Sequence, residues 1–493
     1  MPLMPSFLQP REYSGLPAIV CRRDETSCDL SGLVQQLKAE SECLMWLDSA
    51  RQHPATGRYS MLGWDPWLTM ETRGASSQLR YAESIEECAG SPLTTLRRLL
   101  GRYSGPQMPV LPPGLGWFVV VGYELNQWIE RLPPPKSGQT APELLVFGMQ
   151  GLFVVDHTNN HTWCVSVINP FEAPARARRL AYERLERMHA WLQTEQSTWH
   201  PVGEPSTAPT RIEPTMSQAD FETMVRAAQV SIADGEIFQA NLAQRFTAEW
   251  TQAPWGLYQR LRAINPSPFA CYLQTPEVSL VSCSPERLVR VHDGRLEARP
   301  IAGTRPRGGN AQEDLLNSLE LILSDKERAE HIMLVDLARN DLGRICRYGS
   351  VRVEELMALE EYSHVIHIVS NVVGTLRRGV DAVDVLSAMF PGGTITGCPK
   401  VRSMEIIHAL EPVPRGLYTG SCGWLGFDGS LDLNILIRTM VLLGQQLSFH
   451  VGAGIVADSQ PEREYHETLA KAQALFRALD RSSTTLACDA AIG

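Results

Sequence analysis

Apolar and polar residues alternate along several short stretches of the early part of the chain, which is typical of strands with one buried face. Strands are predicted at 44–50, 57–67, 115–123, 144–157 and 162–169. Gly63 to Pro66 (Gly-Trp-Asp-Pro) should form the turn that closes the first two strands. A helix is expected at 171–194, where Arg and Glu are interleaved on the solvated face. The pattern therefore predicts an antiparallel, β-rich region with helices on it.

A segment rich in Pro, Ser and Thr, 197–215, lacks apolar periodicity and is predicted to be a linker. The predicted organisation is an N-terminal β-rich region at 1–196, the linker at 197–215, a second region at 216–481 and a flexible tail at 482–493. After the linker, Ser217 should cap a helix that ends near Asp234, and 237–250 has the pattern of a further strand.

Composition narrows the class of protein. The chain has 493 residues, of which 44% are hydrophobic and 20% charged, so it can bury a sizeable core. Its formal net charge of −10 argues against binding nucleic acid or an anionic membrane. The start lacks the features of a secretory signal, and the longest apolar run, near 116–123, is too short to cross a bilayer. The 11 cysteines include no CxxC pair, which favours free thiols in a reducing cytoplasm.

The stretch 390–400, FPGGTITGCPK, is the most distinctive in the chain. Glycines let a backbone approach a ligand closely, and the neighbouring hydroxyls can hydrogen-bond it. Gly392 and Gly397 have the spacing of a phosphate-binding loop, but Cys398 and Pro399 follow where that loop needs Lys and Ser/Thr. A nucleotide site is therefore disfavoured. We expect a strand and turn that lead into a helix.

Two pairs of glutamates have helical spacing. Glu327 and Glu330 lie one turn apart in a strongly helical stretch, and Glu464 and Glu467 repeat this, with Lys471 one turn further on. Two acidic helix faces can jointly supply carboxylates to Mg²⁺. The alternative is that both faces are merely solvated.

Histidine and arginine residues supply further candidates. His364 and His367 are three residues apart in a predicted strand, so they point to opposite faces and do not share a zinc ion. One of them can act as an acid, base or hydrogen-bond donor, or be a satisfied core histidine. Arg438 stands alone among apolar residues and needs an anionic partner, either a substrate carboxylate or a structural Asp. The backbone of 452–454 can offer N–H groups to an anion.

The residues alone therefore indicate a cytosolic α+β enzyme that uses Mg²⁺ and an anionic small substrate. The competing class is a non-catalytic binding or regulatory subunit.

In combination, these segments resemble the chorismate-utilising enzymes, in particular the aminodeoxychorismate synthase and anthranilate synthase component I branches. The motifs that carry the resemblance are RPIAGTRPRG, ERAEHIMLVDLARNDLGR, FPGGTITGCPK, GAGIVADS and EYHETLAKA. The resemblance is strong over about 217–480 and weaker over 30–170. It implies two mainly antiparallel β-sheets in a sandwich wrapped by helices, with 216–481 as the chorismate-binding region.

The resemblance also assigns roles residue by residue. It implies that Glu330 and Glu467 ligate Mg²⁺, with Glu327 and Glu464 close by through water. It implies Glu286 as the general acid for the departing C4 hydroxyl, and His367 as the catalytic histidine. The residues implied to contact substrate are Gly303, Thr304, Tyr418, Arg438, Gly452, Ala453, Gly454 and Lys471.

The nucleophile follows from Gln239 and Thr394. Relatives that add water have a lysine where this chain has Gln239, and a glutamine cannot act as a base. The resemblance thus implies ammonia, supplied by a glutamine amidotransferase partner, because no glutaminase region is expected after Lys471.

The product is harder to predict. The stretch 390–400 and Asn434 favour 4-amino-4-deoxychorismate. Ala302 has the anthranilate pattern, since many aminodeoxychorismate synthases have a nucleophilic lysine there. A regulatory pocket is expected at Ser49, Pro266 and Ser267, where anthranilate synthases bind tryptophan, although Asp48 replaces the usual glutamate.

Overall fold

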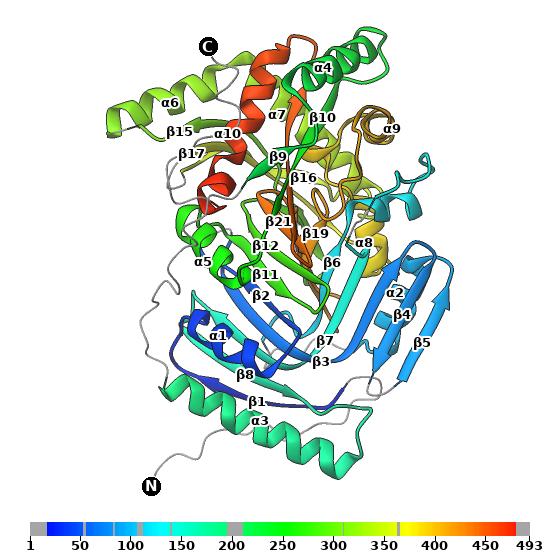
Figure 1. Cartoon of the computed structure of the whole chain (residues 1–493), viewed down its shortest axis with the longest axis vertical. Coiled ribbons are helices and arrows are strands. Elements are labelled where there is room, and N and C mark those ends of the chain that lie inside the picture. Colours follow the sequence, from blue (N-terminus) through cyan, green and yellow to red (C-terminus); the bar gives the residue numbers. More distant parts are fainter. Residues whose placement is uncertain are drawn as a thin grey trace.

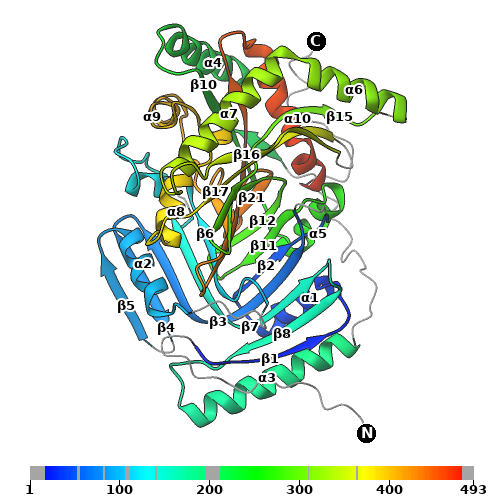
Figure 2. The same cartoon turned by 180° about the vertical axis from the view of Figure 1, so that it is seen from behind.

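Antiparallel ladders join the described strands into one hydrogen-bonded network (Figures 1 and 2). This computed structural model describes residues 17–52, 56–81, 84–105, 112–138, 141–194, 211–308, 310–361 and 365–479. The predicted linker and tail, and His364, lie largely or wholly outside these ranges.

The strands before the linker are β1 (Ile19–Asp24), β2 (Leu44–Asp48), β3 (Tyr59–Arg73), β4 (Ser76–Tyr81), β5 (Ser84–Ala89), β6 (Gly116–Val121), β7 (Leu144–Asp156) and β8 (His161–Val167). The later strands are β9 (Ile212–Pro214), β10 (Gln239–Glu249), β11 (Phe269–Gln274), β12 (Val278–Ser284), β13 (Arg287–His292), β14 (Arg295–Ala298), β15 (Ile301–Pro306), β16 (Arg352–Glu361), β17 (Val365–Thr375), β18 (Gly397–Cys398), β19 (Ser421–Gly426), β20 (Leu431–Asn434), β21 (Thr439–Leu443) and β22 (Gln446–Ile455).

The helices are α1 (Ser31–Glu40), α2 (Pro92–Arg102), α3 (Pro174–Thr194), α4 (Gln218–Ala233), α5 (Pro254–Ile264), α6 (Ala311–Leu323), α7 (Asp325–Gly343), α8 (Ala382–Met389), α9 (Lys400–Leu410) and α10 (Pro461–Leu479). Two 3₁₀ turns complete the set, η1 (Tyr123–Trp128) and η2 (Gly393–Ile395). No described helix is long and apolar enough to span a membrane.

Strands from the two ends of the chain share hydrogen bonds. β2 pairs with β11, Met45 lying opposite Leu273. β6 pairs with β19, Val121 lying opposite Ser421. The part of the chain before the linker therefore supplies strands that lie directly beside those of the later part.

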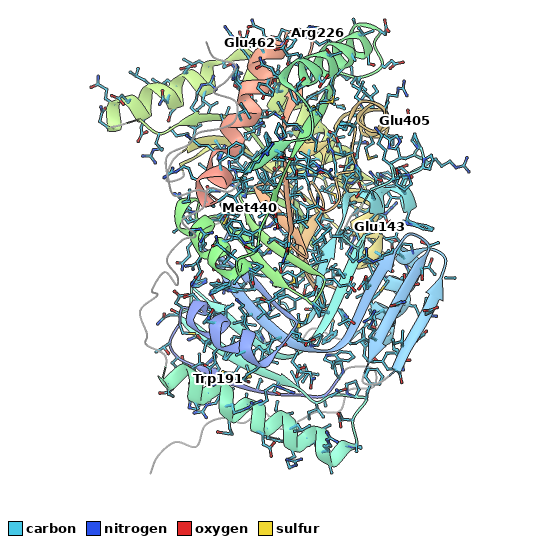
Figure 3. The ribbon with its side chains drawn as sticks, viewed as in Figure 1. Glu143, Trp191, Arg226, Glu405, Met440 and Glu462 are labelled. Carbon is cyan, nitrogen blue, oxygen red and sulfur yellow. The ribbon has the colours of Figure 1, made fainter. Side chains whose placement is uncertain are left out.

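The core confirms the α+β sandwich that was expected. One buried cluster consists almost entirely of strand residues, among them Met45, Phe118, Phe147, Cys271 and Leu280, so two sheet faces pack directly on each other. The helices cover the outer faces. In Figure 3 the labelled charged side chains on these helices, Arg226, Glu405 and Glu462, lie at the periphery, while Met440 lies inside.

The predicted strands and helices of the early part of the chain are present with similar bounds, but the Gly-Trp-Asp-Pro turn is wrong. β3 runs continuously from Tyr59 to Arg73 through these residues. Its pairing with β7 shifts register between Pro66 and Leu68, and Asp65 adopts a φ of 53°. A β-bulge accommodates the residues that break the ladder, so the strand bends without ending. The cap at Ser217 is confirmed, where Ser217 and Asp220 form a capping box.

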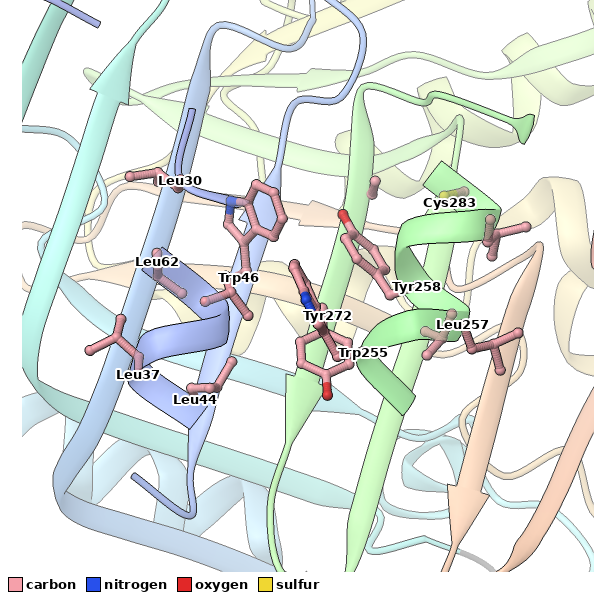
Figure 4. Packing of buried hydrophobic residues seen from close by; sticks show 14 of the residues in the cluster. Leu30, Leu37, Leu44, Trp46, Leu62, Trp255, Leu257, Tyr258, Tyr272 and Cys283 are labelled. Atoms are coloured by element: carbon pink, nitrogen blue, oxygen red, sulfur yellow. The ribbon is translucent and has the colours of Figure 1, made fainter. Parts of the chain in front are cut away.

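Trp46 should be a large contributor to stability. Its side chain, 1% exposed, packs at 5.8 Å from the Trp255 ring and 5.6 Å from that of Tyr258 (Figure 4). Trp46→Ala is expected to lower the free energy of unfolding by about 3–5 kcal/mol, because a buried cavity replaces the ring. Denaturant unfolding measures this. Ile85→Ala, at a side chain 60% exposed, is the control and should change stability by less than about 0.5 kcal/mol.

Candidate active site

The stretch 390–400 lies between α8 and α9 and turns back on β10. Gly393 to Ile395 form η2, and Cys398 then pairs with Gln239 at the start of β10. Gly397 has a φ of 137°, and a Cβ there would lie 2.0 Å from the carbonyl oxygen of Gln239. Only glycine allows this approach. The turn that bears Thr394 therefore packs directly against the start of β10, where Gln239 lies.

Glu286 occupies the loop between β12 and β13 and is 5% exposed. Burial raises its pKa from 4.5 to about 7. The neighbouring Thr394 hydroxyl, the main-chain N–H of Ile301 and the charge of Arg438 act weakly in the opposite direction. A carboxyl group with this pKa is half protonated near neutral pH and can donate its proton to a leaving group.

Arg438 lies close enough to both Glu286 and His367 for its charge to lower the pKa of each. It has a φ of 51°, in the left-handed region that a residue with a Cβ seldom adopts. Such strain persists where the surroundings impose it, and it clusters at functional sites. Its half-buried guanidinium lies 3.5 Å from Asn265 Oδ1. Arg438 is therefore placed to receive an anion beside the acid.

His367 is on β17, opposite Thr304 of β15 and Glu360 of β16. Burial and the charge of Arg438 together lower its pKa to about 4, against the raising effects of a hydrogen bond with the main chain of Gly303 and of the charge of Glu360. The imidazole is therefore neutral at pH 7 and can polarise a substrate group without carrying a charge. Gly303, with a φ of 70°, lets the main chain pass close to Glu327.

The opposite wall is formed by β10 and β22. In this ladder Asn241 pairs with Gly454, Leu242 with Ala453 and Ala243 with Gly452. A Cβ at Gly454 would lie 2.4 Å from Gln239 Nε2, and one at Gly452 would lie 2.8 Å from the Tyr418 hydroxyl. The two glycines therefore make room for these side chains. Lys471 Nζ donates to the Gly452 carbonyl at 3.1 Å, which ties α10 to this wall.

One polar atom near this wall, Asn241 Oδ1, is buried without a hydrogen bond in the described part of the chain, while the Thr394 hydroxyl lies close enough to Glu286 to lower the pKa of that carboxyl group. The Asn241 amide also donates to the Thr394 carbonyl at 3.4 Å. Unsatisfied buried polar atoms are costly, so atoms of this kind point to a ligand that completes them.

The four glutamates predicted to hold a metal are brought together by α7 and α10. Burial and the charges of Glu327, Glu467 and Glu464 together raise the pKa of Glu330 to about 7, against the lowering effect of Lys326. Carboxylates close enough to raise one another's pKa can be stabilised by a hard divalent cation, which prefers oxygen ligands. The donor set therefore fits Mg²⁺ chemically.

In this structure three of the four glutamates lie beside a cation. Glu327 contacts Arg305 at 3.1 Å, Glu467 contacts Lys471 at 2.8 Å, and Lys326 lies 4.0 Å from Glu330. Among the described residues no three His, Cys, Asp or Glu side chains are close enough together to hold an ion. The fold thus brings the two acidic helix faces together, and these three side chains lie beside Arg305, Lys471 and Lys326.

The predicted regulatory pocket is only partly formed by the residues named from the sequence. A cavity of about 170 Å³ is lined by Ser49, with Asp48 and Pro268. Pro266 and Ser267 do not line it, and the Ser267 hydroxyl donates to the Asn265 carbonyl at 3.1 Å. Asp48 is held by Arg262 at 2.5 Å and by the Tyr258 hydroxyl at 2.9 Å.

Sequence reasoning did not identify Asn241 or Arg415. Asn241 is a polar residue with a partly exposed side chain in an otherwise mostly buried strand, which was a usable signal. Arg415 gives less of a signal, because the site elements that it bonds, at Ile395 and Asn241, are 20 and 174 residues away along the chain.

Comparisons with known proteins identify the family and the fold. Residues 42–477 match the family described as chorismate binding enzyme. The chain is 41% identical to aminodeoxychorismate synthase component 1 of Bacillus subtilis, over 88% of this chain and 91% of that protein. It is 36% identical to anthranilate synthase component 1 of Acetivibrio thermocellus, over 96% and 97%. The crystal structure of anthranilate synthase component I from Streptococcus pneumoniae superposes with a TM-score of 0.74 at 32% identity, covering 87% of this chain and 93% of that one. The chain therefore belongs to the family of chorismate-binding enzymes.

Proposed function

We propose that this enzyme aminates chorismate to 4-amino-4-deoxychorismate, with Mg²⁺ as cofactor and ammonia supplied by a glutamine amidotransferase partner. The observation that carries the proposal is the group formed by the buried Glu286 and His367 with the half-buried Arg438, whose charge acts on both, and by Thr394, which interacts with Glu286 from the turn that pairs with Gln239. Similarity to the Bacillus subtilis protein supports the choice of product. The reducing cytoplasm is the proposed location, which suits the free thiols of the described cysteines.

The overall reaction consumes chorismate and ammonia and releases water. Glu286 gives its proton to the C4 hydroxyl as the C–O bond breaks, so water leaves in place of hydroxide. Arg438 holds a carboxylate of the substrate by a charge-assisted hydrogen bond. His367, neutral at pH 7, hydrogen-bonds the substrate and adds no second positive charge beside Arg438.

Gln239 determines whether water or ammonia attacks chorismate. Gln239 is 8% exposed and has no basic group, so it cannot take a proton from water. Its amide can hydrogen-bond ammonia, which already carries a lone pair and needs no base. Asn241 Oδ1, buried without a hydrogen bond in the described part of the chain, and Thr394 Oγ1, which interacts with Glu286, are further groups that can orient it.

Glu330 and Glu467 would hold Mg²⁺, with Glu327 and Glu464 nearby. Magnesium bound there would neutralise a substrate carboxylate and stabilise the charge that develops as the C4 oxygen leaves. Lys471 bonds both Glu467 and the Gly452 carbonyl, so this residue links the acidic faces to the substrate wall.

A second candidate, conversion of chorismate to anthranilate and pyruvate, is favoured by Ala302. This residue lies on β15 opposite Ile368 and one position before Gly303, and its methyl group cannot form a covalent intermediate. The similarity to anthranilate synthases over nearly the whole chain also supports it.

Product identification tests both candidates. Purified protein is incubated with chorismate, Mg²⁺ and ammonium, and the products are separated by chromatography before and after adding a lyase that releases pyruvate from 4-amino-4-deoxychorismate. We expect 4-aminobenzoate only after the lyase is added. Anthranilate formed without the lyase would establish the second candidate, and unchanged chorismate would contradict both.

A further inference from the structure

Arg415 is a buried cation outside the groups to which the reaction has assigned roles. It follows α9, and its side chain is 1% exposed. Glu411, one helical turn earlier and 6% exposed, receives its guanidinium through two hydrogen bonds, of 2.9 and 2.6 Å. This pair is fully removed from water, so its other hydrogen bonds determine whether it is stable.

The remaining N–H groups of Arg415 reach two elements that carry the site. Nη1 donates to the carbonyl of Ile395 at 2.9 Å, in the turn that bears Thr394. Nη2 donates to the carbonyl of Asn241 at 2.7 Å, two residues after Gln239 on β10. Arg415 therefore joins the turn and the strand at the level of their main chains.

Glu411 strengthens this connection from the other side of the ion pair. Its Oε1 also accepts the main-chain N–H of Ala243 at 2.8 Å, so the pair holds β10 at two points. Glu124 fixes the segment itself, because its Oε1 accepts the N–H groups of Arg415 and Gly416 at 2.9 and 3.2 Å. The main chain at Arg415 is therefore held in place as well as the guanidinium.

A third wall is also in contact. The guanidinium carbon of Arg415 lies 5.6 Å from the centre of the Tyr418 ring, whose hydroxyl approaches Gly452. The Tyr418 ring is stacked on His450 at 5.1 Å. On its other flank Arg415 lies 4.8 Å from the ring of Tyr123. Cation–π contacts with buried rings restrict the plane of the guanidinium.

Stability alone is a poor explanation for this arrangement. A buried ion pair is on average no more stabilising than well-packed apolar residues of the same volume. The planar, forked guanidinium can bind a carboxylate and two carbonyls at fixed angles, which an ammonium group cannot. We propose that Arg415, held by Glu411, is a positioning residue that sets the distance between the Thr394 turn and the Gln239 strand. The inference rests on the proposed amination only for its kinetic consequence.

The catalytic consequence follows from how the two carbonyls are linked to the reacting groups. The Asn241 amide also donates to the Thr394 carbonyl, so the turn and the strand move together when either is displaced. A misplacement of about 1 Å in an active site costs on the order of 100-fold in rate. Loss of Arg415 should therefore lower kcat more than it raises the KM for chorismate, because Arg438, which binds the carboxylate, is undisturbed.

The test compares Arg415→Lys with a matched control, Arg184→Lys. Arg184 is similarly buried and joins Ser166 and Gln150 in the N-terminal part of the chain. Both variants lose a forked guanidinium and should lose comparable stability. Amide hydrogen exchange of the substrate-free protein is measured over 390–400 and 239–245, and kcat and KM are measured with chorismate, Mg²⁺ and ammonium.

We expect Arg415→Lys to speed exchange in both segments and to lower kcat about 100-fold per folded molecule. Arg184→Lys should leave exchange in both segments and kcat within twofold of the wild type. Guanidinium chloride at concentrations that do not denature should restore part of the activity of Arg415→Ala, and Glu411→Gln should give a milder form of the same defect.

Exchange in these segments equal to that of Arg184→Lys would overturn the proposal, whether or not the wild type consumes chorismate. Faster exchange with unchanged kcat in an active enzyme would also overturn it. A wild-type protein that leaves chorismate unchanged would contradict the proposed function alone, since the exchange measurement does not depend on turnover.

Discussion

Glu286→Gln is expected to remove nearly all chorismate consumption, with kcat lower by on the order of 10³-fold. The amide keeps the shape of the side chain in its buried loop but has no proton to give to the leaving hydroxyl. Because the change is isosteric, folding should be preserved, as circular dichroism would check. Glu297→Gln, on neighbouring β14 where the carboxylate pairs with Arg295, is the control and should retain full activity.

The pH dependence makes this prediction sharper. The raised pKa of Glu286, about 7, means that the acid is protonated below neutral pH and loses its proton above it. With the concentration of free ammonia held constant, kcat/KM should fall as pH rises through about 7. The same shift affects stability, because the folded state holds this proton more tightly than the unfolded state, in which the pKa is near 4.5. The stability contribution is present below pH 4.5 and is lost by about pH 7.

The residual rate of Glu286→Gln should lack this dependence on pH. A variant that kept wild-type turnover, or that kept the same fall near pH 7, would show that another group supplies the proton. Unfolding of the two proteins across the same pH range measures the stability effect independently of catalysis.

Glu330→Ala is expected to have the second large effect. Chorismate consumption should fall on the order of 10³-fold, because the Mg²⁺ proposed to bind there would contribute several kcal/mol to the stabilisation of charge in the transition state. Removal of the metal from the wild type with a chelator should have the same result and should be reversed by added Mg²⁺. Glu405→Ala on α9, where the partly exposed Glu405 pairs with Arg402, is the control for removing a helix carboxylate.

Binding of the metal can be followed without turnover. Mg²⁺ at about 100 times its Kd should stabilise the wild type by about 2.7 kcal/mol, which raises its melting temperature, and should not stabilise Glu330→Ala. If Glu330→Ala kept both the activity and the Mg²⁺-dependent shift, the metal would be bound elsewhere. The glutamates would then be acidic helix faces paired with Arg305, Lys326 and Lys471.

Features set by neighbours in sequence were the ones that could be predicted. The spacing of Glu327 and Glu330 placed both on one face of a helix, and α7 spans them. Ser217 predicted the start of α4, because its capping partner, Asp220, is only three residues away. The resemblance to a known family supplied the rest of the candidate site, since only a set of motifs in order can relate residues as distant as Glu286 and Tyr418.

Features set by distant partners could not be predicted. The left-handed conformation of Arg438 depends on the strands on either side of it and has no local signal such as glycine. The Gly-Trp-Asp-Pro segment has the composition of a turn, but pairing with β7 keeps it in a strand, because the ladder outweighs the local preference. The bonds from Arg415 to the carbonyls of Ile395 and Asn241 likewise come from tertiary contacts.

The pairing of β2 with β11 has a consequence for the nascent chain. Asp48 lies opposite Ala270, about 220 residues later in the chain. A ribosome adds about 5–20 residues per second, so this edge of β2 waits for its partner for on the order of 10–40 s. During that interval the unpaired apolar edge of β2 can pair with strands of other chains and cause aggregation. The enzyme should therefore depend on chaperones, slow growth or low temperature to be produced in soluble form, however stable it is once complete.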